Sequence, residues 1–528
     1  MSVPIKLLST GCSFFSENPE GVFTPEQFSS DEQLMISTAE QFTRKEILPL
    51  IDRIDKQEDG LMPSLVAKAG ELGFCGADTP EAYGGLGLGK NVAARMLEFL
   101  SLNGSFSVTL GVSSGISQIP ISLFGSESQK AQYLPRLSSG ECIGAYALSE
   151  PNSGSDALSA TTRADRKGND YILNGTKMWI SNAKWAGLFV VFAKVDGEKF
   201  SAFLLERDFP GVEISREEHK LGLKGSSTAR VVLDNAVVPQ QNLLHEEGKG
   251  HHVAFNALNM GRFKLAAMSL GPARDSIEHA IRYAKDRKQF GQSLSTFGLI
   301  QKKFAEMAAR YFAVESMLYR TGAMIDAAFD SSPKTIDGNI KAAEEFSVEC
   351  SACKVMATEA EAFIIDESLQ VFGGYGFTEE FPLARHYRDA RVSRIYEGTN
   401  EINRVFLGDR LIRRAKVGRA STVGLQDSFI SCLAHNALKR TVTDQIRLGA
   451  LSDLVMLTYA EQSSRIRSES IGGAAVLAHR VFVDWANAQA AIAFQTVTSE
   501  ALTLPTRNQS PILDLADAVF ATETMLHF

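Results

Sequence analysis

One stretch indicates most about how this chain folds: Arg394-Ile395-Tyr396-Glu397-Gly398-Thr399-Asn400-Glu401-Ile402-Asn403-Arg404. Gly398 permits a sharp backbone turn, and Thr399 is of the type that caps helix N-termini. Apolar residues then recur at helical spacing, at Ile402, Val405, Phe406 and Ile412. The stretch therefore predicts a carboxylate, Glu397, at the mouth of a helix between hydrophobic groups. Desolvation raises the pKa of a carboxylate towards neutrality, which suits a general base, although an ordinary surface glutamate has the same local pattern.

Long helical segments lead up to this stretch. The apolar spacing predicts helices over residues 253–290, 299–329 and 339–372, before the helix that starts at Thr399. Gly271-Pro272 is expected to kink the first of them. Long helices joined by short loops predict a four-helix bundle, and the core of a bundle is a common place for a cofactor.

A second pattern lies upstream of the bundle. Short apolar runs bounded by turn residues predict a compact β domain, in which Asn174-Gly175 predicts a tight hairpin turn. Helical periodicity lies on both sides of it. The expected fold is therefore mainly α with a central β domain. Its expected parts are a flexible N-terminal tail (1–24), an N-terminal helical domain (25–140), a middle β-barrel domain (141–250), the four-helix bundle (251–412) and an additional helical domain (413–528).

Composition excludes several classes of function. The 528 residues carry a net charge of -8, with a pI near 5.7, which argues against general nucleic-acid binding. No run reaches the ~18 apolar residues of a membrane span, and residues 1–20 do not resemble a signal peptide, so a cytosolic protein is expected. Six cysteines fit a reducing compartment. Cys350 and Cys353 are expected to be bundle thiols, and no metal site is expected.

Four further motifs accompany the 394–404 stretch. They are Tyr-Ala-Leu-Ser-Glu-Pro-Asn-Ser-Gly-Ser-Asp at 146–156, Lys-Met-Trp-Ile-Ser-Asn at 177–182, Asp-Arg-Lys-Gln-Phe-Gly at 286–291 and Gln-Val-Phe-Gly-Gly-Tyr-Gly at 370–376. Small residues in the first motif let backbone N–H groups approach a ligand closely. Together with the order of the domains, the motifs resemble those of the flavin-dependent acyl-CoA dehydrogenases over residues 25–412.

The resemblance implies FAD as the cofactor and a homodimer as the assembly. Trp179 would stack on the flavin ring, and Arg287 and Phe290 would reach the flavin of a neighbouring subunit, with the guanidinium on the pyrophosphate. The implied flavin contacts are Tyr146, Leu148, Ser149, Gly154, Ser155, Trp179, Ser181, Arg287, Gln289, Phe290, Gln370, Gly373, Gly374, Thr399 and Glu401. Glu401 fits least well, because an acidic side chain does not suit a pyrophosphate at a helix N-terminus.

The resemblance also implies a reaction, the α,β-dehydrogenation of an acyl-CoA. Glu397 falls on the family's catalytic base, which removes the α-proton while the β-hydrogen leaves as hydride to the flavin. A backbone N–H at the glutamate and a flavin hydroxyl would polarise the thioester oxygen. The implied substrate contacts are Ser155, Arg262, Tyr396, Gly398, Gly111 and Gly115. A tight helix crossing would explain the two glycines equally well, and a surface salt bridge would explain Arg262.

Several differences from the common family pattern make the chain more similar to the very-long-chain branch of the family, which is homodimeric and membrane-associated. Gly298 stands where many members have Gln, and the segment Met-Gly-Arg-Phe at 260–263 and the C-terminal extension point the same way. Small residues at 111–115 would leave room for a long acyl chain. A basic segment is formed by Arg410, Arg413, Arg414, Lys416 and Arg419. It suits peripheral contact with an anionic membrane, or simply a solvated helix face.

The expected function is dehydrogenation of a long- or very-long-chain acyl-CoA in fatty acid β-oxidation, with electrons passed to an electron-transfer flavoprotein. One alternative is a scaffold or assembly factor derived from this family, with residues 413–528 as its binding surface. Another is an acyl-CoA oxidase that uses oxygen as acceptor. The expected location is cytoplasmic for a bacterial protein, peripheral to the inner membrane if it contacts lipid, and mitochondrial for a eukaryotic one.

Overall fold

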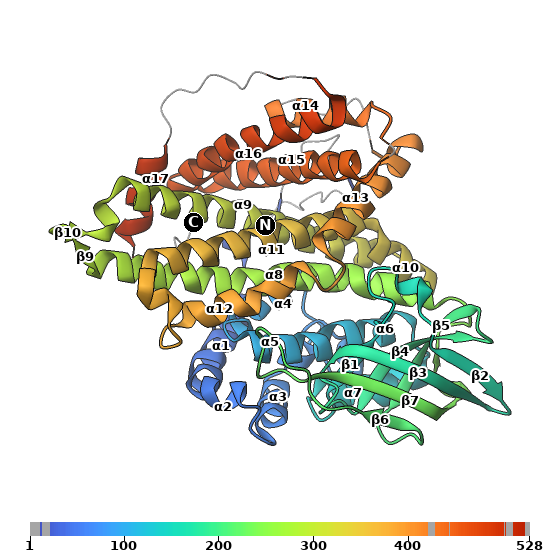
Figure 1. Ribbon diagram of the computed structural model, residues 1–528. Helices are drawn as coiled ribbons and strands as arrows, with labels where there is room; N and C mark the ends of the chain where they lie inside the picture. Colours follow the sequence, from blue (N-terminus) through green and yellow to red (C-terminus); the bar gives the residue numbers. More distant parts are fainter. Residues whose placement is uncertain are drawn as a thin grey trace. The chain divides into compact units, whose positions relative to one another are not determined.

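The computed structural model describes residues 11–12, 22–420, 428–442, 444–500, 502 and 511–522 (Figure 1). The chain divides into two compact units. The sheet unit consists of Ser30–Lys264 and Ser332–Glu344. The bundle unit consists of Met1–Ser29, Leu265–Ser331 and Glu345–Phe528.

Local capping explains several helices of the sheet unit. Asn103 accepts a hydrogen bond from the Phe106 N–H at 2.9 Å and so begins α5, and Ser126 with Gln129 forms a capping box that begins α7. The helices of this unit are α1 (Ser30–Phe42), α2 (Ile51–Asp55), α3 (Leu61–Glu71), α4 (Lys90–Leu100), α5 (Gly104–Gly111), the π-helical segment η7 (Val112–Ser117), α6 (Gln118–Phe124), α7 (Glu127–Ser138), the start of α8 (Gly250–Asp286) and most of α10 (Ile336–Glu345).

One mixed sheet forms the rest of the sheet unit. Its strands are β1 (Gly144–Ala147), β2 (Arg163–Lys167), β3 (Asp170–Ser181), β4 (Leu188–Val195), β5 (Lys199–Glu206), β6 (Val212–Ile214), β7 (Thr228–Pro239) and β8 (Leu243–Leu244). They follow the order β6-β7-β3-β2-β4-β5-β8, and β1 pairs with β4 in parallel. Alternate residues of β7 are buried, so one face of the strand supplies the core.

The predicted hairpin turn at Asn174-Gly175 is wrong. β3 runs through both residues as one strand of Asp170–Ser181 that pairs antiparallel with β7. The register shifts between Leu173 and Gly175, which marks a bulge. A Cβ atom at Gly175 would lie 2.4 Å from Thr162 Oγ1, so glycine is needed here for close packing. The Asn-Gly pair lies in a bulge and not in a turn, because the pairing of β3 with β7 overrides the local turn preference.

The consecutive segments α5, η7 and α6 form a long apolar helix. By length and composition, Gly104–Phe124 would be long enough to cross a membrane. However, 67% of its most apolar window is buried inside the protein, as expected for a core helix. These properties are therefore weak grounds for a membrane span.

Long helices make up the bundle unit, as predicted. α8 continues unbroken through Pro272, and the Ser276 hydroxyl donates to the Pro272 carbonyl at 2.7 Å. Within the unit, α11 packs on α9 and on α13. The elements after α8 are β9 (Lys288–Gln289), β10 (Gln292–Ser293), α9 (Gly298–Ser331), α11 (Ser347–Phe372), α12 (Pro382–Ala390), α13 (Asn400–Lys416), α14 (Phe429–Leu438), α15 (Gln445–Ile471), α16 (Ala474–Thr498) and α17 (Ile512–Ala521). The predicted class, mainly helical with a central sheet and extra C-terminal helices, is confirmed.

Buried arginines attach the C-terminal helices to the bundle. α15, α16 and α17 all contact α9 (Figure 1). Arg320 of α9 is buried and donates to Gln462 Oε1 at 2.8 Å, while Arg467 of α15 binds Glu315 of α9 at 2.8 Å. A buried charge that loses its partner is strongly destabilising. The extension is therefore an integral part of the bundle unit.

The predicted basic segment is partly neutralised within the bundle unit. Arg414 is buried, and its guanidinium donates to Cys12 Sγ at 3.3 Å. Arg419 binds Glu345 at 2.6 Å, and Arg413 binds Asp409 at 2.8 Å. These contacts reduce the cationic surface that the segment offers to an anionic membrane.

Candidate active site

Two left-handed residues precede α13. Glu397 has φ 56° and Gly398 has φ 80°. Glycine adopts this conformation freely, but a glutamate there is strained, at a cost of order 1–3 kcal/mol. Thr399 then caps the helix as predicted, since its side chain accepts from the Ile402 N–H at 3.2 Å. Strain of this kind persists where surrounding groups hold it, and it is frequent at functional sites.

Two buried polar side chains hold this turn. Asn403 Nδ2 donates to the carbonyls of Gly398 at 2.8 Å and Thr399 at 3.0 Å. Lys354 Nζ, from α11, donates to the Gly398 carbonyl at 2.9 Å and to Asn400 Oδ1 at 2.6 Å. Asn403 and Lys354 are fully buried. They fix the backbone that carries Glu397. Lys354 was missed in the sequence because its contact with Gly398 spans 44 residues, whereas Asn403 lies within the 394–404 stretch itself.

A third buried group lies under the segment that leads to Glu397. Glu361 of α11 is 4% exposed, and its Oε2 accepts a hydrogen bond from the Ser393 hydroxyl at 2.8 Å. Burial raises the pKa of Glu361 to about 8, against smaller opposing effects of the hydroxyl and of Arg394. Burial also raises the pKa of Tyr396, and the charges of Glu361 and Glu397 add to that rise. Glu361 is therefore protonated at neutral pH beneath this segment.

Glu361 makes the stability of the protein depend on pH. Between its ordinary pKa of 4.5 and about 8, the folded protein keeps a proton that the unfolded chain releases. This term therefore lowers the free energy of unfolding as pH rises, by up to about 1.4 kcal/mol per pH unit. Glu361→Gln cannot ionise, so its stability relative to the wild type should increase from pH 5 to pH 8. Urea unfolding at several pH values measures this, and parallel pH profiles for the two proteins would contradict it.

Glu401 has a local explanation. Its side chain is exposed in the first turn of α13, and its own backbone N–H and the Thr399 hydroxyl hold the pKa of the carboxyl below its usual range. A negative charge at a helix N-terminus is stabilised by the free N–H groups there. The carboxylate thus complements the cap of α13.

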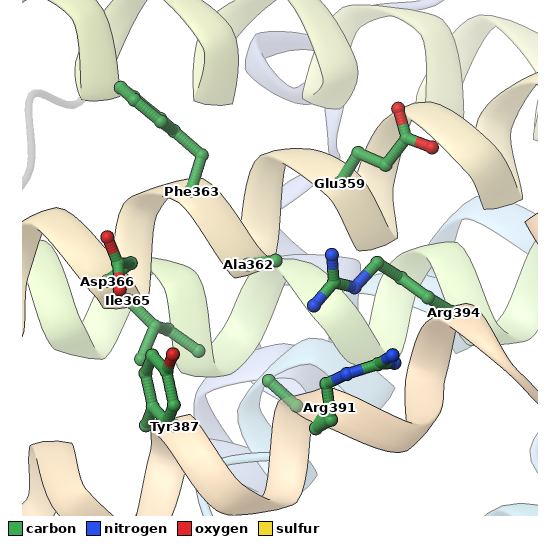
Figure 2. Close-up of a pocket in the computed structure, with 9 residues that line it drawn as sticks. Glu359, Ala362, Phe363, Ile365, Asp366, Tyr387, Arg391 and Arg394 are labelled. Carbon is green, nitrogen blue, oxygen red and sulfur yellow. The ribbon is translucent and has the colours of Figure 1, made fainter.

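A pocket of about 370 Å³ lies beside the supporting network of Glu397 (Figure 2). Figure 2 shows Arg391 and Arg394 beneath α11, from the short helix that follows α12. Glu359 of α11 lines the pocket, and it also binds Arg404 at 2.7 Å and Asn400 at 3.0 Å. The pocket is lined by Glu359, Ala362, Phe363, Ile365, Asp366, Tyr387, Ala390, Arg391 and Arg394. None of these residues was predicted as a site residue.

Two other predicted motifs meet within the bundle unit. The Arg287 guanidinium lies over the Tyr375 ring at 5.9 Å, which joins the 286–291 motif to the 370–376 motif. Phe290 is 94% exposed at the tip of the β9–β10 hairpin, with φ 51°. Arg287, Gln289, Gln370, Gly373 and Gly374 are also exposed. An exposed cation beside exposed aromatic rings and open glycines suits a phosphate group and a planar base.

The sheet unit carries the other predicted motifs. Trp179 is 55% exposed, with φ 57°, at a second register shift of β3 between Lys177 and Ile180. The Met178 N–H donates to the Ser149 carbonyl at 2.9 Å, which sets the 146–156 loop beside this bulge. A Cβ atom at Gly154 would meet nothing within 4 Å among the described residues. An exposed indole next to an open, glycine-containing loop fits a planar ligand such as a flavin ring.

Further predicted residues have definite places in the sheet unit. Leu148 is buried, Ser149 and Ser181 are half-buried and Ser155 is exposed. Tyr146 is buried, and its hydroxyl donates to the Ala254 carbonyl at 3.4 Å.

A buried ion pair holds the loop to the sheet. Lys177 Nζ lies 2.6 Å from Glu150 Oε1, with side-chain exposures of 0% and 3%, and it also donates to the Leu148 carbonyl at 3.3 Å. The Glu150 carboxylate accepts from the N–H groups of Thr161 at 2.6 Å and Thr162 at 3.1 Å. Burial opposes ionisation of Glu150, but the lysine and these donors hold the pKa of its carboxyl well below the usual range. The pair is therefore charged, and each partner makes further hydrogen bonds.

Asn182 is a further residue that the sequence did not single out. It has φ 66°, and its Nδ2 donates to the carbonyls of Thr109 and Gly144, both at 2.9 Å. It joins the end of β3 to α5 and to β1. The available signal in the sequence was the residue type, because asparagine at the end of the Trp-Ile-Ser-Asn segment adopts the left-handed conformation more readily than most residues.

The predicted substrate residues of the sheet unit lie on two helices. Gly111 ends α5, and Gly115 lies within η7. Short π-helical segments inside helices are frequent at functional sites. Arg262 of α8 is buried and donates to Asn259 Oδ1 at 3.1 Å. Its burial does not fit the surface position of the salt bridge that was the alternative explanation.

Comparisons with known proteins agree with this arrangement. Three family models match in succession, described as acyl-CoA dehydrogenase N-terminal domain (residues 29–141), middle domain (145–236) and C-terminal domain (248–412). A probable acyl-CoA dehydrogenase of Bacillus subtilis is 47% identical over 403 residues, 75% of this chain and 68% of that protein. The human mitochondrial very long-chain specific acyl-CoA dehydrogenase is 40% identical over 349 residues, 64% of this chain and 51% of that protein.

A solved structure resembles the described chain nearly throughout. It is an acyl-CoA dehydrogenase from Bacillus anthracis complexed with FAD, at 36% identity and a TM-score of 0.91. The match covers 98% of this chain and 100% of that one. It therefore includes the helices that follow the bundle.

Proposed function

This chain belongs to the acyl-CoA dehydrogenase family, and from that premise we propose that it dehydrogenates a long- or very-long-chain acyl-CoA to the trans-2-enoyl-CoA. The family binds FAD, and the residues present fit it. The exposed Trp179 suits the flavin ring, and the exposed Arg287 beside Tyr375 suits the pyrophosphate and adenine. When bound, FAD accepts the hydrogen that leaves the β-carbon as hydride.

The main observation in support of the proposal is the strained turn at Glu397, which hydrogen bonds from buried side chains hold in place. A carboxylate needed only for solubility would not be held at φ 56° by buried side chains such as Lys354 and Asn403. Glu397 takes the α-proton as general base. Its backbone N–H donates to the thioester oxygen and stabilises the negative charge that develops there.

The substrate contacts are assigned in the same proposal. Gly111 and Gly115 give the acyl chain room along η7, Tyr396 and Gly398 flank the thioester, and Arg262 and Ser155 contact the CoA part. The very-long-chain branch is supported by these glycines, by Gly298 and by the C-terminal helices. The proposed partners are a second copy of this chain and an electron-transfer flavoprotein, in the cytoplasm of a bacterial cell or in mitochondria.

Anaerobic titration with acyl-CoAs of graded chain length tests the function. The purified protein should be yellow, and a long-chain acyl-CoA should bleach the visible flavin band. Colour should return on addition of an electron-transfer flavoprotein. If no chain length bleaches the flavin, dehydrogenation is the wrong reaction. If hydrogen peroxide forms in air at the rate of turnover, the protein is an oxidase instead.

The C-terminal helices do not require a separate scaffold function. Arg320 and Arg467 bind them to α9 through buried contacts. This packing supports a structural role for the extension within the enzyme.

A further inference from the structure

The segment η7 borders open space on the side that faces Lys264. Gly115 is buried, yet among the described residues a Cβ atom built there would meet one atom within 4 Å, Lys264 Cδ at 3.5 Å. Protein interiors are close-packed. A buried backbone position with so few neighbours in one direction therefore lies against free volume, and the lysine side chain bounds that volume.

Lys264 is held in this place by its charged end. Its Nζ lies 2.9 Å from Asp78 Oδ1 and 3.1 Å from the Ser114 carbonyl, and its side chain is 13% exposed. Asp78 also binds Lys90 at 2.9 Å through its other oxygen. Burial opposes ionisation of Asp78, but the two ammonium groups hold the pKa of its carboxyl well below the usual range. Lys264 is thus a fixed, charged boundary, unlike a mobile surface lysine.

Displacing such a boundary is costly. Movement of the Lys264 side chain would break a mostly buried ion pair and a hydrogen bond, and an uncompensated buried charge is strongly unfavourable. An apolar group that enters the space beside Gly115 gains contact with the methylenes of Lys264. It cannot extend further without meeting the ammonium group.

We propose that Lys264 is a specificity-determining residue, which closes the acyl site beside Gly115 and sets the upper limit of acyl chain length. The inference rests on the proposed function, which assigns the acyl chain to Gly111 and Gly115. Those glycines alone would admit very long chains. With Lys264 in place, the enzyme prefers long chains that end at the lysine over very long chains that would have to pass it.

Lys264→Ala tests this directly, because it removes about four chain atoms from the boundary of the space. The optimum of kcat/KM should move to longer acyl-CoAs. For chains beyond the wild-type optimum, kcat/KM should rise by about fourfold for each further methylene that the new space accommodates. The dependence on chain length should be the same for acyl-CoA affinities measured by calorimetry in the Glu397→Gln background, where turnover is slowed by about 10²–10⁴-fold.

Lys90→Ala is the matched control. It removes the other lysine from Asp78 but leaves the Lys264 contact at Gly115, so its chain-length profile should equal that of the wild type. If Lys90→Ala shifts the profile as far as Lys264→Ala, the charge of Asp78 matters and the boundary model is wrong. An unchanged profile for Lys264→Ala also overturns it.

Gly115→Leu provides a second route should Lys264→Ala fold poorly. It fills the same space and should shorten the profile, whereas an unchanged profile would place the acyl chain elsewhere. If no acyl-CoA of any chain length bleaches the flavin of the wild-type protein, the proposed function itself is wrong. The calorimetric series would then still report whether binding depends on chain length at Lys264.

Discussion

Replacing Glu397 with glutamine should lower the rate of flavin bleaching by acyl-CoA by about 10²–10⁴-fold. The amide has nearly the shape of the carboxylate but cannot accept the α-proton. Lys354 and Asn403 bind the backbone of the turn rather than the Glu397 side chain, so the fold and the yellow colour should be retained. Stopped-flow absorbance under anaerobic conditions measures the effect.

Two other variants distinguish the role of the Glu397 carboxylate from that of a neighbouring carboxylate and from that of the strained backbone. Glu401→Gln changes an exposed carboxylate in the same stretch and should retain most of the rate. Glu397→Gly relieves the left-handed strain at φ 56° and should raise the free energy of unfolding by about 1 kcal/mol, with activity lost. Rapid bleaching by Glu397→Gln would remove Glu397 from the role of base.

Replacing Lys177 with methionine should destabilise the protein by about 3–5 kcal/mol, because Glu150 is left charged or must take up a proton in a buried place. The 146–156 loop loses one of its ties to β3, although the Met178 N–H still donates to the Ser149 carbonyl, so the FAD content should also fall. Urea unfolding gives the free energy of unfolding, and the flavin absorbance retained after gel filtration gives the FAD content.

A double variant provides the control for this buried pair. Glu150→Gln with Lys177→Met leaves no isolated charge and should recover much of the stability. Lys68→Met breaks an exposed pair with Glu46 in the same unit and should change little. Equal loss for the buried and the exposed lysine would contradict the account of the loop.

The sequence predicted the elements whose cause is local. The apolar period placed a helix over 299–329, and the structure has α9 at Gly298–Ser331. The cap at Thr399 follows from one residue type at one position, and it is confirmed. The motif residues could be named from the resemblance, but their roles stay predictions until they are measured.

Contacts between distant segments could not be predicted from the sequence. Asn174-Gly175 is a turn by local preference and a bulge in the sheet, because only the pairing with β7 decides between them. Lys354 holds the Glu397 turn from 44 residues away, and Lys264 reaches Asp78 across 186 residues. A lysine inside a helical apolar pattern was the available sign in both cases.

The ion pair between Arg467 and Glu26 bears on how the chain acquires its fold during synthesis. These residues are 441 positions apart, and their side chains lie 2.6 Å from each other within the bundle unit. At roughly 5–20 residues per second, a ribosome needs about 20–90 s to make the intervening chain. Glu26 must wait for that time without its partner, whereas Glu315 of α9, 152 positions before Arg467, waits about 8–30 s at the same rate. Chaperone demand should therefore peak late in translation, and a stalled ribosome short of α15 would hold an exposed, aggregation-prone bundle.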